Sequence, residues 1–328
     1  MQALILTSFA APMTIANLPV SQPGPGQVLV RIAASGVNPL DTKIAAGAAP
    51  HARPRLPAIL GIDLAGTVAA VGDDVTTFHI GATVYGMAGG IAGIQGSLAE
   101  YGVFDAALLA PVPPALSMRD AAALPLVFIT AWEGLVDRAH VKAGDTVLVH
   151  GGAGGVGHMA VQLAASLGAT VFATGSAASR AAIEALGARF IDYRTSTVDD
   201  YVAEHTGGAG FDIVYDTVGG ATLDASFQAA KIYGGHVVSC LGWGTFALSP
   251  LTARAASYSG VFTLLPLLSG QGHARHGAIL REANKLIEAG KLRVRLDPRR
   301  FTLRTVHDAH VAQMEGSARG KLVVDVAG

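Results

Sequence analysis

The sequence predicts an α/β fold in which a doubly wound parallel sheet is combined with a second, β-rich domain. Two observations lead to this prediction. Residues 123–266 alternate short apolar strands with helical segments, which is typical of a parallel sheet with right-handed crossovers. Residues 1–122 instead hold short β-like runs separated by Pro and Gly, which favours a compact β-rich domain.

A glycine-rich turn lies at the centre of the alternating region. Residues 146–150 form a short apolar run that is typical of a buried strand, and apolar residues at helical spacing follow the turn. Between them, Gly152 suits a tight turn, Gly154 lets a pyrophosphate approach the backbone, and Gly157 lets helix and strand pack closely. The free N–H groups and the positive end of the helix dipole then face the phosphates. With a further strand at residues 170–174, this arrangement predicts a dinucleotide site.

The end of that further strand indicates which dinucleotide is bound. An NAD site normally ends this strand with Asp or Glu, which accepts hydrogen bonds from the adenosine ribose. Here the strand ends in Thr174-Gly175-Ser176 without an acid, and the small Ser176 hydroxyl neither repels nor crowds a phosphate. Arg180 and Tyr193-Arg194 supply donors for a 2′-phosphate, although each arginine is equally explained as a solvated surface charge. The sequence therefore predicts NADPH as the cofactor. The residues expected to contact it are Gly152, Gly154, Gly155, Val156, Gly157, Ser176, Arg180, Tyr193 and Gly242.

Composition argues against several classes of function. The chain of 328 residues has 23 Lys and Arg against 24 Asp and Glu, so its charge favours neither nucleic acid nor an anionic membrane as the principal partner. Residues 121–136 are the longest apolar candidate for a membrane span, but Pro125 and Glu133 interrupt them. The N-terminus lacks the features of a signal peptide, so we expect a cytoplasmic protein. The single cysteine, Cys240, cannot form an internal disulfide or a multi-cysteine zinc site.

Several segments carry predictions about local structure. Ser117 is expected to cap helical structure over residues 117–137, and residues 276–288 are expected to form an amphipathic helix. Residues 291–296 alternate arginines with apolar residues, which favours a half-solvated strand over a nucleic-acid groove. Residues 258–265 have the β-rich apolar character of another strand.

Several separate motifs occur in order along the chain. They are Val37-Asn38-Pro39-x-Asp41-x-Lys43, Gly61-Ile62-Asp63-x-x-Gly66-x-Val68-x-x-Val71-Gly72, Ala99-Glu100-Tyr101, Phe128-x-Thr130-Ala131-Trp132, His150-Gly151-Gly152-Ala153-Gly154-Gly155-Val156-Gly157, Gly234-Gly235-x-Val237-Val238 and Gly320-Lys321-Leu322-Val323-Val324. In these motifs the chain resembles the medium-chain dehydrogenase/reductase superfamily, specifically its zinc-free quinone oxidoreductase-like (zeta-crystallin-type) branch. The resemblance implies a GroES-like catalytic domain from residues 1–122 and 267–328 and a Rossmann NADP-binding domain at residues 123–266. It also implies a homodimer that pairs through the strand at residues 258–265.

The resemblance also bears on metal binding. In the zinc alcohol dehydrogenases of this superfamily, the ligands of the catalytic zinc stand in segments that match Asn38, Ile62 and Leu126. Isoleucine and leucine cannot ligate, and one amide oxygen cannot hold zinc, so we expect no catalytic metal. Two histidine pairs at i, i+3 spacing lack a third ligand and are expected to be surface residues. These pairs are His273/His276 and His307/His310.

Without a metal, an electron-poor acceptor is the favoured substrate. A quinone or an α,β-unsaturated carbonyl delocalises the incoming electrons itself, whereas a simple alcohol needs a Lewis acid. We therefore expect hydride transfer from NADPH to such a small-molecule acceptor, with the protein supplying proximity. The resemblance makes Asn38, Asp41, Lys43 and Thr130 the catalytic candidates, with Thr130 near the nicotinamide and Lys43 near developing oxyanion charge. Each also has a structural explanation, as a turn residue, a helix cap, a solvated charge or a hydrogen bond within a helix.

Other functions stay open. An enoyl reductase is less favoured, because residues 47–51 lack the tyrosine that such enzymes use as proton donor, although His51 could take that role. A zinc-free alcohol dehydrogenase-like enzyme is another alternative. A further alternative is a low-turnover protein that binds NADPH or RNA, as crystallin-like relatives do. The complete glycine fingerprint favours an enzyme.

Overall fold

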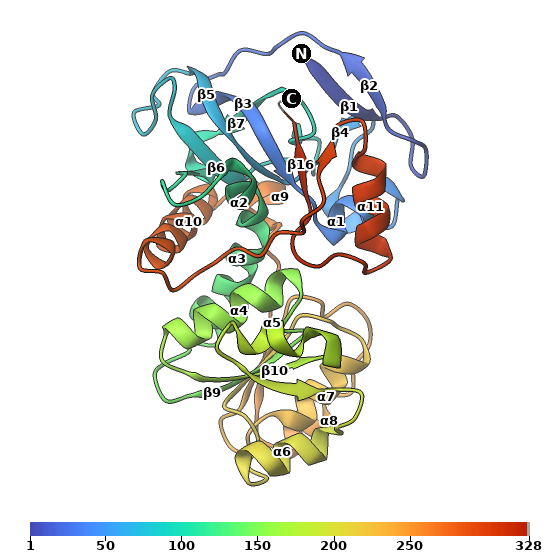
Figure 1. Ribbon diagram of the computed structural model, residues 1–328, viewed down its shortest axis with the longest axis vertical. Coiled ribbons are helices and arrows are strands. Elements are labelled where there is room, and N and C mark those ends of the chain that lie inside the picture. Colours follow the sequence, from blue (N-terminus) through green and yellow to red (C-terminus); the bar gives the residue numbers. More distant parts are fainter. Residues whose placement is uncertain (327–328) are drawn as a thin grey trace. The chain divides into compact units, whose positions relative to one another are not determined.

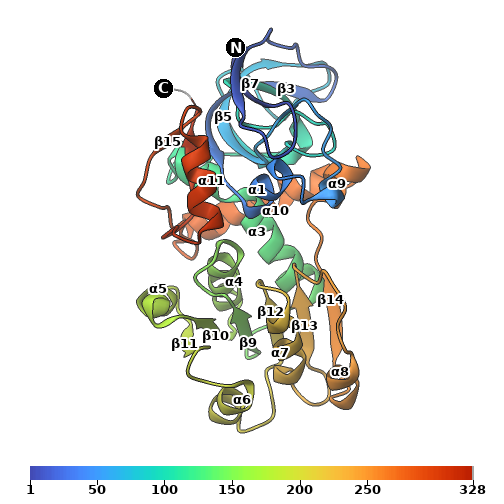
Figure 2. The same ribbon diagram turned by 90° about the vertical axis from the view of Figure 1, so that its right-hand side faces the viewer.

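The computed structural model describes residues 1–326, which fold into two compact units. The terminal unit is formed by Met1–Leu126 and Leu264–Gly328, so it draws on both ends of the chain. The central unit is formed by Val127–Thr263. Figures 1 and 2 show the helices and strands of each unit in two views.

The central unit is built on a six-stranded sheet in which all neighbouring strands are parallel. Its strands are β9 Thr146–His150, β10 Thr170–Gly175, β11 Arg189–Asp192, β12 Ile213–Asp216, β13 His236–Ser239 and β14 Ser257–Gly260. They lie in the order β11-β10-β9-β12-β13-β14 (Figure 2). β9 comes first in the chain but lies inside the sheet, with β10 on one side and β12 on the other. This confirms the predicted doubly wound sheet, in which ligands bind beyond the carboxyl ends of the strands where the order reverses.

Helices alternate with these strands along the chain. They are α4 Gly155–Ser166, α5 Arg180–Glu184, α6 Val198–Thr206, α7 Ala221–Ala229 and α8 Ser249–Ala253, with a 3₁₀ turn, η4, at Ala177–Ser179. α4 packs against β9 and β10, and α7 packs against β12 and β13. Each crossover therefore returns the chain to the same edge of the sheet, which brings the carboxyl ends of the strands together.

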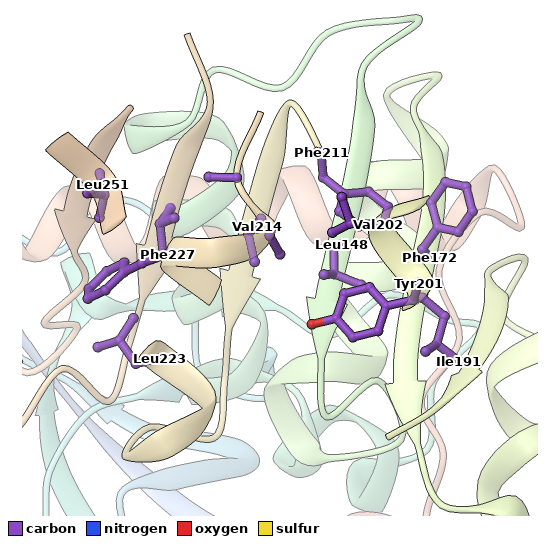
Figure 3. Close-up of a cluster of buried hydrophobic side chains, with 13 residues drawn as sticks. Leu148, Phe172, Ile191, Tyr201, Val202, Phe211, Val214, Leu223, Phe227 and Leu251 are labelled. Carbon is purple, nitrogen blue, oxygen red and sulfur yellow. The ribbon is translucent and has the colours of Figure 1, made fainter. Parts of the chain in front are cut away.

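One cluster of buried apolar side chains in the central unit covers one face of this sheet (Figure 3). Leu148 and Val214 come from neighbouring strands, and Tyr201 and Phe227 pack onto them from α6 and α7. Residues 147–149 are fully buried, including those on either side of Leu148. Burial on both faces explains why β9 reads as a continuous apolar run and not as an alternating one.

The terminal unit is rich in short strands. They are β1 Gln2–Leu6, β2 Thr14–Asn17, β3 Gln27–Gly36, β4 Ala58–Ile59, β5 Asp63–Val71, β6 Thr83–Met87, β7 Tyr101–Asp105, β8 Leu109–Pro111, β15 Phe301–Thr302 and β16 Val323–Asp325. One sheet has the order β15-β16-β3-β5-β6-β8, with β7 paired to β3, and a three-stranded sheet has the order β2-β1-β4. The long strand β3 pairs antiparallel with β5, β7 and β16, so it joins the two ends of the chain. The predicted β-rich domain is confirmed.

The terminal unit also contains α-helices and 3₁₀ turns. They are α1 Pro39–Ala45, α2 Met118–Ala123, α9 Leu265–Ser269, α10 His273–Glu288 and α11 Val306–Met314, with 3₁₀ turns η1 at Pro50–Ala52 and η2 at Ala106–Leu108. α10 buries Ile279, Leu280, Ala283 and Ile287 on one face, as its periodicity predicts. Among residues 1–326, no helix combines the length and the apolar character needed to cross a membrane.

The helical stretch that follows Ser117 is divided into three pieces. The Ser117 hydroxyl accepts a hydrogen bond from the Asp120 N–H at 3.2 Å, which confirms the predicted cap of α2. A second helix, α3, spans Pro125–Trp132, and a π-helical segment, η3, follows at Glu133–Arg138. Because proline has no N–H to continue a helix, α3 begins anew at Pro125.

Two predicted strands are wrong in part. Residues 291–296 form no strand, and only Leu296 pairs, in an isolated bridge to Lys321. The bridge is limited to the Lys321 N–H, which donates to the Arg295 carbonyl at 2.8 Å, and the Asp297 N–H, which donates to the Lys321 carbonyl at 2.9 Å; β16, which follows, already pairs with β3 and β15. Of residues 258–265, only the first three belong to a strand, because Leu265 starts α9 and Pro266 suits a first helical turn. β14 lies at an edge of the central sheet, and its pairing in a homodimer stays a prediction.

Candidate cofactor site and buried polar cluster

The glycine-rich turn leads from the carboxyl end of β9 into α4. The Gly152 N–H donates to the Thr174 carbonyl at 2.9 Å, which ties the turn to the end of β10. Gly154 is the N-cap of α4 and is exposed. Gly155 and Val156 open the helix, where backbone N–H groups have no partner within the helix itself. The turn therefore presents backbone donors at the ligand-binding edge of the sheet.

The glycines of this turn meet two different steric requirements. A Cβ on Gly157 would lie 2.1 Å from the Gly151 carbonyl oxygen, and a Cβ on Gly152 would lie 2.6 Å from the Cβ of Ala173. Both glycines are therefore required by contacts inside the protein. A Cβ on Gly154 would meet nothing nearer than the Gly151 oxygen at 3.2 Å. Gly154 is also exposed at the start of α4, where a side chain would stand in front of the helix N–H groups, so the residues present fit the diphosphate of a dinucleotide.

Polar side chains near the ends of β9, β10 and β12 hold the turn by hydrogen bonds, and the sequence analysis did not assign them this role. The Thr174 hydroxyl lies 3.2 Å from both His150 Nδ1 and the Gly151 N–H, and the Thr217 hydroxyl donates to the His150 carbonyl at 2.6 Å. Burial lowers the pKa of His150 to about 4, so its ring is neutral near pH 7. The signal for these residues was a polar side chain at the end of a largely apolar strand, or one residue before or after that end.

Asp216 fixes a second loop at the same edge. It ends β12 and is fully buried. Its carboxylate accepts hydrogen bonds from the Val218 N–H at 3.0 Å, from the Gly219 N–H at 3.0 Å and from the Ser239 hydroxyl at 2.7 Å. Since all three donors are satisfied by one carboxylate, Asp216 sets the path of the loop after β12 and links it to β13.

The residues predicted to select the dinucleotide lie near the ends of β10 and β11. Ser176 follows β10 and is half-buried. The Arg180 guanidinium lies 3.4 Å from the Glu184 carboxylate and 4.3 Å from the centre of the Phe190 ring, and it is exposed. Tyr193 is exposed as well. Gly242, the last of the predicted contacts, lies exposed in the loop after β13.

Thr130 belongs to the central unit and is 5% exposed. Its hydroxyl lies 3.0 Å from the hydroxyl of Thr263, and its carbonyl accepts a hydrogen bond from the Tyr215 hydroxyl at 2.7 Å. Tyr215 stands just before the carboxyl end of β12, so Thr130 lies at the edge of the sheet that carries the glycine-rich turn.

Asn38 and Asp41 lie together in the terminal unit, buried with two residues that the sequence analysis did not connect to them. The Asn38 amide donates to the Asp63 carboxylate at 2.9 Å and accepts from the Lys321 ammonium at 2.6 Å. The Lys321 ammonium also donates to the Val37 carbonyl at 2.8 Å. The Asp41 carboxylate accepts from the Asn38 N–H at 2.8 Å, as a helix-capping residue does. We call Asn38, Asp41, Asp63 and Lys321 the buried cluster; Lys43, by contrast, is exposed.

Burial dominates the electrostatics of the buried cluster. It raises the pKa of Asp41 to about 7 and that of Asp63 to about 6, while the Lys321 charge opposes both shifts. It also lowers the pKa of Lys321. Two carboxyl groups and one ammonium thus lie in a region with almost no solvent exposure, which disfavours the charged form of each group. The catalytic roles of Asn38, Asp41, Lys43 and Thr130 stay predictions.

The variant Asp41→Asn is expected to gain stability relative to the wild type as the pH rises. With a pKa of about 7, the folded protein holds a proton at Asp41 that the unfolded chain releases above about pH 4. Wild-type stability therefore falls between about pH 4 and about pH 7, whereas an amide cannot ionise and still accepts the Asn38 N–H. The difference should grow by about 2–3 kcal/mol between about pH 5 and about pH 8 in urea unfolding followed by circular dichroism. A difference independent of pH contradicts this assignment.

The positions that match zinc ligands do not fit a metal. Ile62 is fully buried and apolar, and Leu126, whose N–H donates to Asp63 at 3.0 Å, has an apolar side chain that cannot ligate a metal. The Asn38 oxygen is held by the Lys321 ammonium, whose charge repels a cation. Within residues 1–326, no three His, Cys, Asp or Glu side chains are grouped so that they could hold a metal ion.

The prediction that both histidine pairs lie on the surface is wrong for one member of each. His276 is fully buried and His310 is 6% exposed, because each faces the interior side of its helix. Burial lowers the pKa of His310 to about 4. His273 contacts the Asp105 carboxylate at 2.6 Å and the Pro266 carbonyl at 3.1 Å, so it links β7 to α9 and α10.

Both units of the chain resemble domains of known proteins. Residues 24–114 match the alcohol dehydrogenase GroES-like domain, and residues 186–324 match the family described as zinc-binding dehydrogenase. The crystal structure of an alcohol dehydrogenase superfamily protein from Novosphingobium aromaticivorans is 53% identical, with a TM-score of 0.98 and 100% of both chains covered. The quinone oxidoreductase from Coxiella burnetii is 30% identical, with a TM-score of 0.85 and coverage of 100% of this chain and 99% of that chain.

Further similar structures include another quinone oxidoreductase and an enoyl reductase. Among curated proteins, the spectinabilin polyketide synthase system protein NorB from Streptomyces orinoci is 38% identical over 269 residues. That match covers 82% of this chain but 12% of the synthase, so the chain spans a small part of the length of such relatives. The two matched domains, together with full-length likeness to solved structures, show that the chain belongs to the medium-chain dehydrogenase/reductase superfamily of pyridine-nucleotide-dependent oxidoreductases.

Proposed function

We propose that the protein is an NADPH-dependent reductase that transfers a hydride to a quinone or an α,β-unsaturated carbonyl without a catalytic metal. The observation that carries this proposal is the glycine-rich turn, where exposed Gly154 is the N-cap of α4 and no side chain covers the first N–H groups of that helix. Backbone donors and the helix dipole there stabilise a diphosphate. Bound NADPH supplies the hydride.

The end of β10 supports NADPH over NADH. Gly175 ends the strand, and half-buried Ser176 follows it in place of the acid that an NAD site uses. The Arg180 guanidinium is exposed a short distance along the chain, where it can leave its weak contact with Glu184 at 3.4 Å. A serine hydroxyl and a guanidinium together suit a phosphate ester better than a ribose hydroxyl.

The donor set supports an acceptor that needs no Lewis acid. Ile62 and Leu126 cannot ligate zinc, and the Asn38 oxygen is already bound by Lys321. A quinone or enone spreads the incoming charge over its own oxygen, so hydrogen-bond donors and proximity are sufficient. Quinone oxidoreductases among the similar structures agree with this acceptor class.

Steady-state oxidation of NADPH and NADH with ortho-quinones, para-quinones and enones tests the proposal. We expect NADPH-selective turnover that depends on the acceptor, with acceptor-free enzyme as the control. If NADPH binds but none of these acceptors is reduced, the proposal is wrong and the low-turnover binding protein becomes the better interpretation. A gel shift with single-stranded RNA then examines that alternative.

The variant Ser176→Asp is expected to turn the preference away from NADPH. A carboxylate there repels a 2′-phosphate and accepts hydrogen bonds from ribose hydroxyls. The KM for NADPH should rise by about tenfold or more, while that for NADH stays equal or falls. Thr77→Asp adds the same charge at an exposed position of the terminal unit and serves as the matched control. Equal changes for both cofactors in Ser176→Asp would count against the NADPH assignment.

A further inference from the structure

Three polar side chains form a continuous hydrogen-bonded chain in the central unit. The hydroxyls of Thr130 and Thr263 lie 3.0 Å apart, and the Thr263 hydroxyl donates to the Glu133 carboxylate at 3.1 Å. Thr130 and Thr263 are 5% and 6% exposed, whereas Glu133 is half-buried. The chain thus runs from a buried hydroxyl to a carboxylate with access to water.

The position of this chain connects it to the ligand-binding edge of the sheet. The Thr130 carbonyl accepts the Tyr215 hydroxyl at 2.7 Å, and Tyr215 precedes the last residue of β12. Thr263 follows soon after the end of β14. Glu133 opens the π-helical segment, a rare conformation that is frequent at functional sites. Gly134 allows the close approach there, since a Cβ on it would lie 2.6 Å from the Tyr215 ring.

Counting hydrogens gives the chain a direction. An ionised carboxylate only accepts, so the Thr263 hydrogen goes to Glu133, and the contact between the two threonines takes its hydrogen from Thr130. When Glu133 is protonated, the order reverses, and Glu133 donates to Thr263, which donates to Thr130. The Thr130 hydrogen is then donated to a group other than Thr263. Rotation of two hydroxyls is sufficient for this reversal.

We propose that Thr130, Thr263 and Glu133 form a proton relay that completes reduction of the acceptor. The relay rests on the proposed function. The β-carbon of an enone receives a hydride, with two electrons, which forms a C–H bond and leaves an enolate. The Thr130 O–H bond then breaks and its proton goes to the enolate. Thr130 takes the Thr263 proton, Thr263 takes the Glu133 proton, and the Glu133 carboxylate takes a new proton from water. The acceptor gains one hydride and one proton in total.

Matched variants of Thr263 and Glu133 distinguish a proton relay from hydrogen bonds that only stabilise the fold. Thr263→Val keeps the shape of the side chain but removes the hydroxyl, Thr263→Ser keeps the hydroxyl, and Glu133→Gln keeps the shape but removes the exchangeable carboxyl proton. Carbon-13 NMR of the Glu133 carboxyl, assigned from its loss in Glu133→Gln, should shift in cofactor-free Thr263→Val and return toward the wild-type value in Thr263→Ser. An unchanged signal in Thr263→Val shows that the hydrogen bond is absent and overturns the relay.

Turnover of 2-methylcyclohex-2-enone provides the second readout. In Thr263→Val and Glu133→Gln we expect kcat to fall by about 10²-fold, the scale of general-acid catalysis, with NADPH affinity unchanged and largely wild-type kcat in Thr263→Ser. The wild type should protonate one face of the enolate, whereas the two relay variants should give mixed configuration at the α-carbon, since water then supplies the proton. Wild-type rate and configuration in an active Thr263→Val enzyme overturn the relay alone. An inactive wild type with all quinones and enones contradicts the proposed function instead.

Discussion

Gly157→Ala and Gly154→Ala are both expected to weaken NADPH binding by about 100-fold or more. The reasons differ, because only Gly157→Ala is expected to destabilise the cofactor-free protein strongly. The Cβ on residue 157 would lie 2.1 Å from the Gly151 carbonyl oxygen and 3.0 Å from the Cα of Gly152. Both contacts are with backbone, which has no flexible end to move away. The turn and the start of α4 must therefore separate, at a cost of about 3 kcal/mol in the central unit.

Gly154→Ala leaves the cofactor-free protein nearly intact. Gly154 has a φ of −72°, which alanine adopts readily, and the nearest atom to its Cβ is 3.2 Å away. Its loss of unfolding free energy should stay below about 1 kcal/mol, since glycine is only a modest N-cap. The methyl group nevertheless fills the space that a diphosphate needs, so a 100-fold loss of affinity, about 2.7 kcal/mol, appears only on binding.

Isothermal titration with NADPH and thermal unfolding of the cofactor-free protein measure the two effects. Gly24→Ala is the control, because its Cβ meets only the flexible Gln27 side chain at 3.3 Å in the terminal unit. If Gly154→Ala binds NADPH as tightly as the wild type, no diphosphate lies against this turn. If Gly157→Ala retains its thermal midpoint, the packing argument is wrong.

The contrast between these glycines shows what a sequence can reveal about this protein. The fingerprint is local, because Gly152, Gly154 and Gly157 act on one turn between a strand and a helix that follow directly. The parallel sheet also followed, since strands that alternate with helices are joined by right-handed crossovers, whereas the order of its strands was not predicted. Local spacing was therefore sufficient for the central unit and for the start of the cofactor site.

Side chains that meet from distant parts of the chain could not be predicted in the same way. Lys321, Asn38 and Asp63 come from opposite ends of the sequence, and β3 brings them together only through its pairing with both β5 and β16. Lysine and aspartate are by default expected at the surface. His276 and His310 were misplaced for a related reason, because their spacing gave no indication of which helix face is covered. Burial of polar groups is a property of tertiary packing.

Lys321→Met is expected to destabilise the terminal unit by about 3–5 kcal/mol, the scale of leaving buried carboxyl groups without the charge that compensates them. Methionine fills a similar volume but donates no hydrogen bond to the Val37 carbonyl or to Asn38 Oδ1, which Lys321 contacts at 2.8 and 2.6 Å. Asp41 and Asp63 then remain buried without the ammonium that lowers their pKa values. Each must take up a proton or carry an uncompensated charge.

A second substitution separates lost charge compensation from lost packing. In the variant Lys321→Met/Asp63→Asn, one of the two buried carboxyl groups becomes a neutral amide that can still accept from the Leu126 N–H, now 3.0 Å from Asp63. We therefore expect the double variant to recover about 1–3 kcal/mol relative to Lys321→Met alone. If Lys321→Met destabilises the protein because the methionine side chain is overpacked, the double variant should not recover stability. Asp63→Asn leaves the volume of the methionine unchanged.

An exposed lysine supplies the matched control. Lys285 forms a surface pair with Glu282 at 2.8 Å on α10 with its side chain 69% exposed, so Lys285→Met should change the unfolding free energy by less than about 0.5 kcal/mol. Urea unfolding near pH 7 measures all four proteins, and NADPH affinity reports separately that the central unit stays folded. A loss in Lys321→Met no larger than that in Lys285→Met would mean that the ammonium does not hold the buried cluster together. The large loss expected here follows from position alone, because the two substitutions are chemically identical and differ only in how much water and how many partners surround the charge.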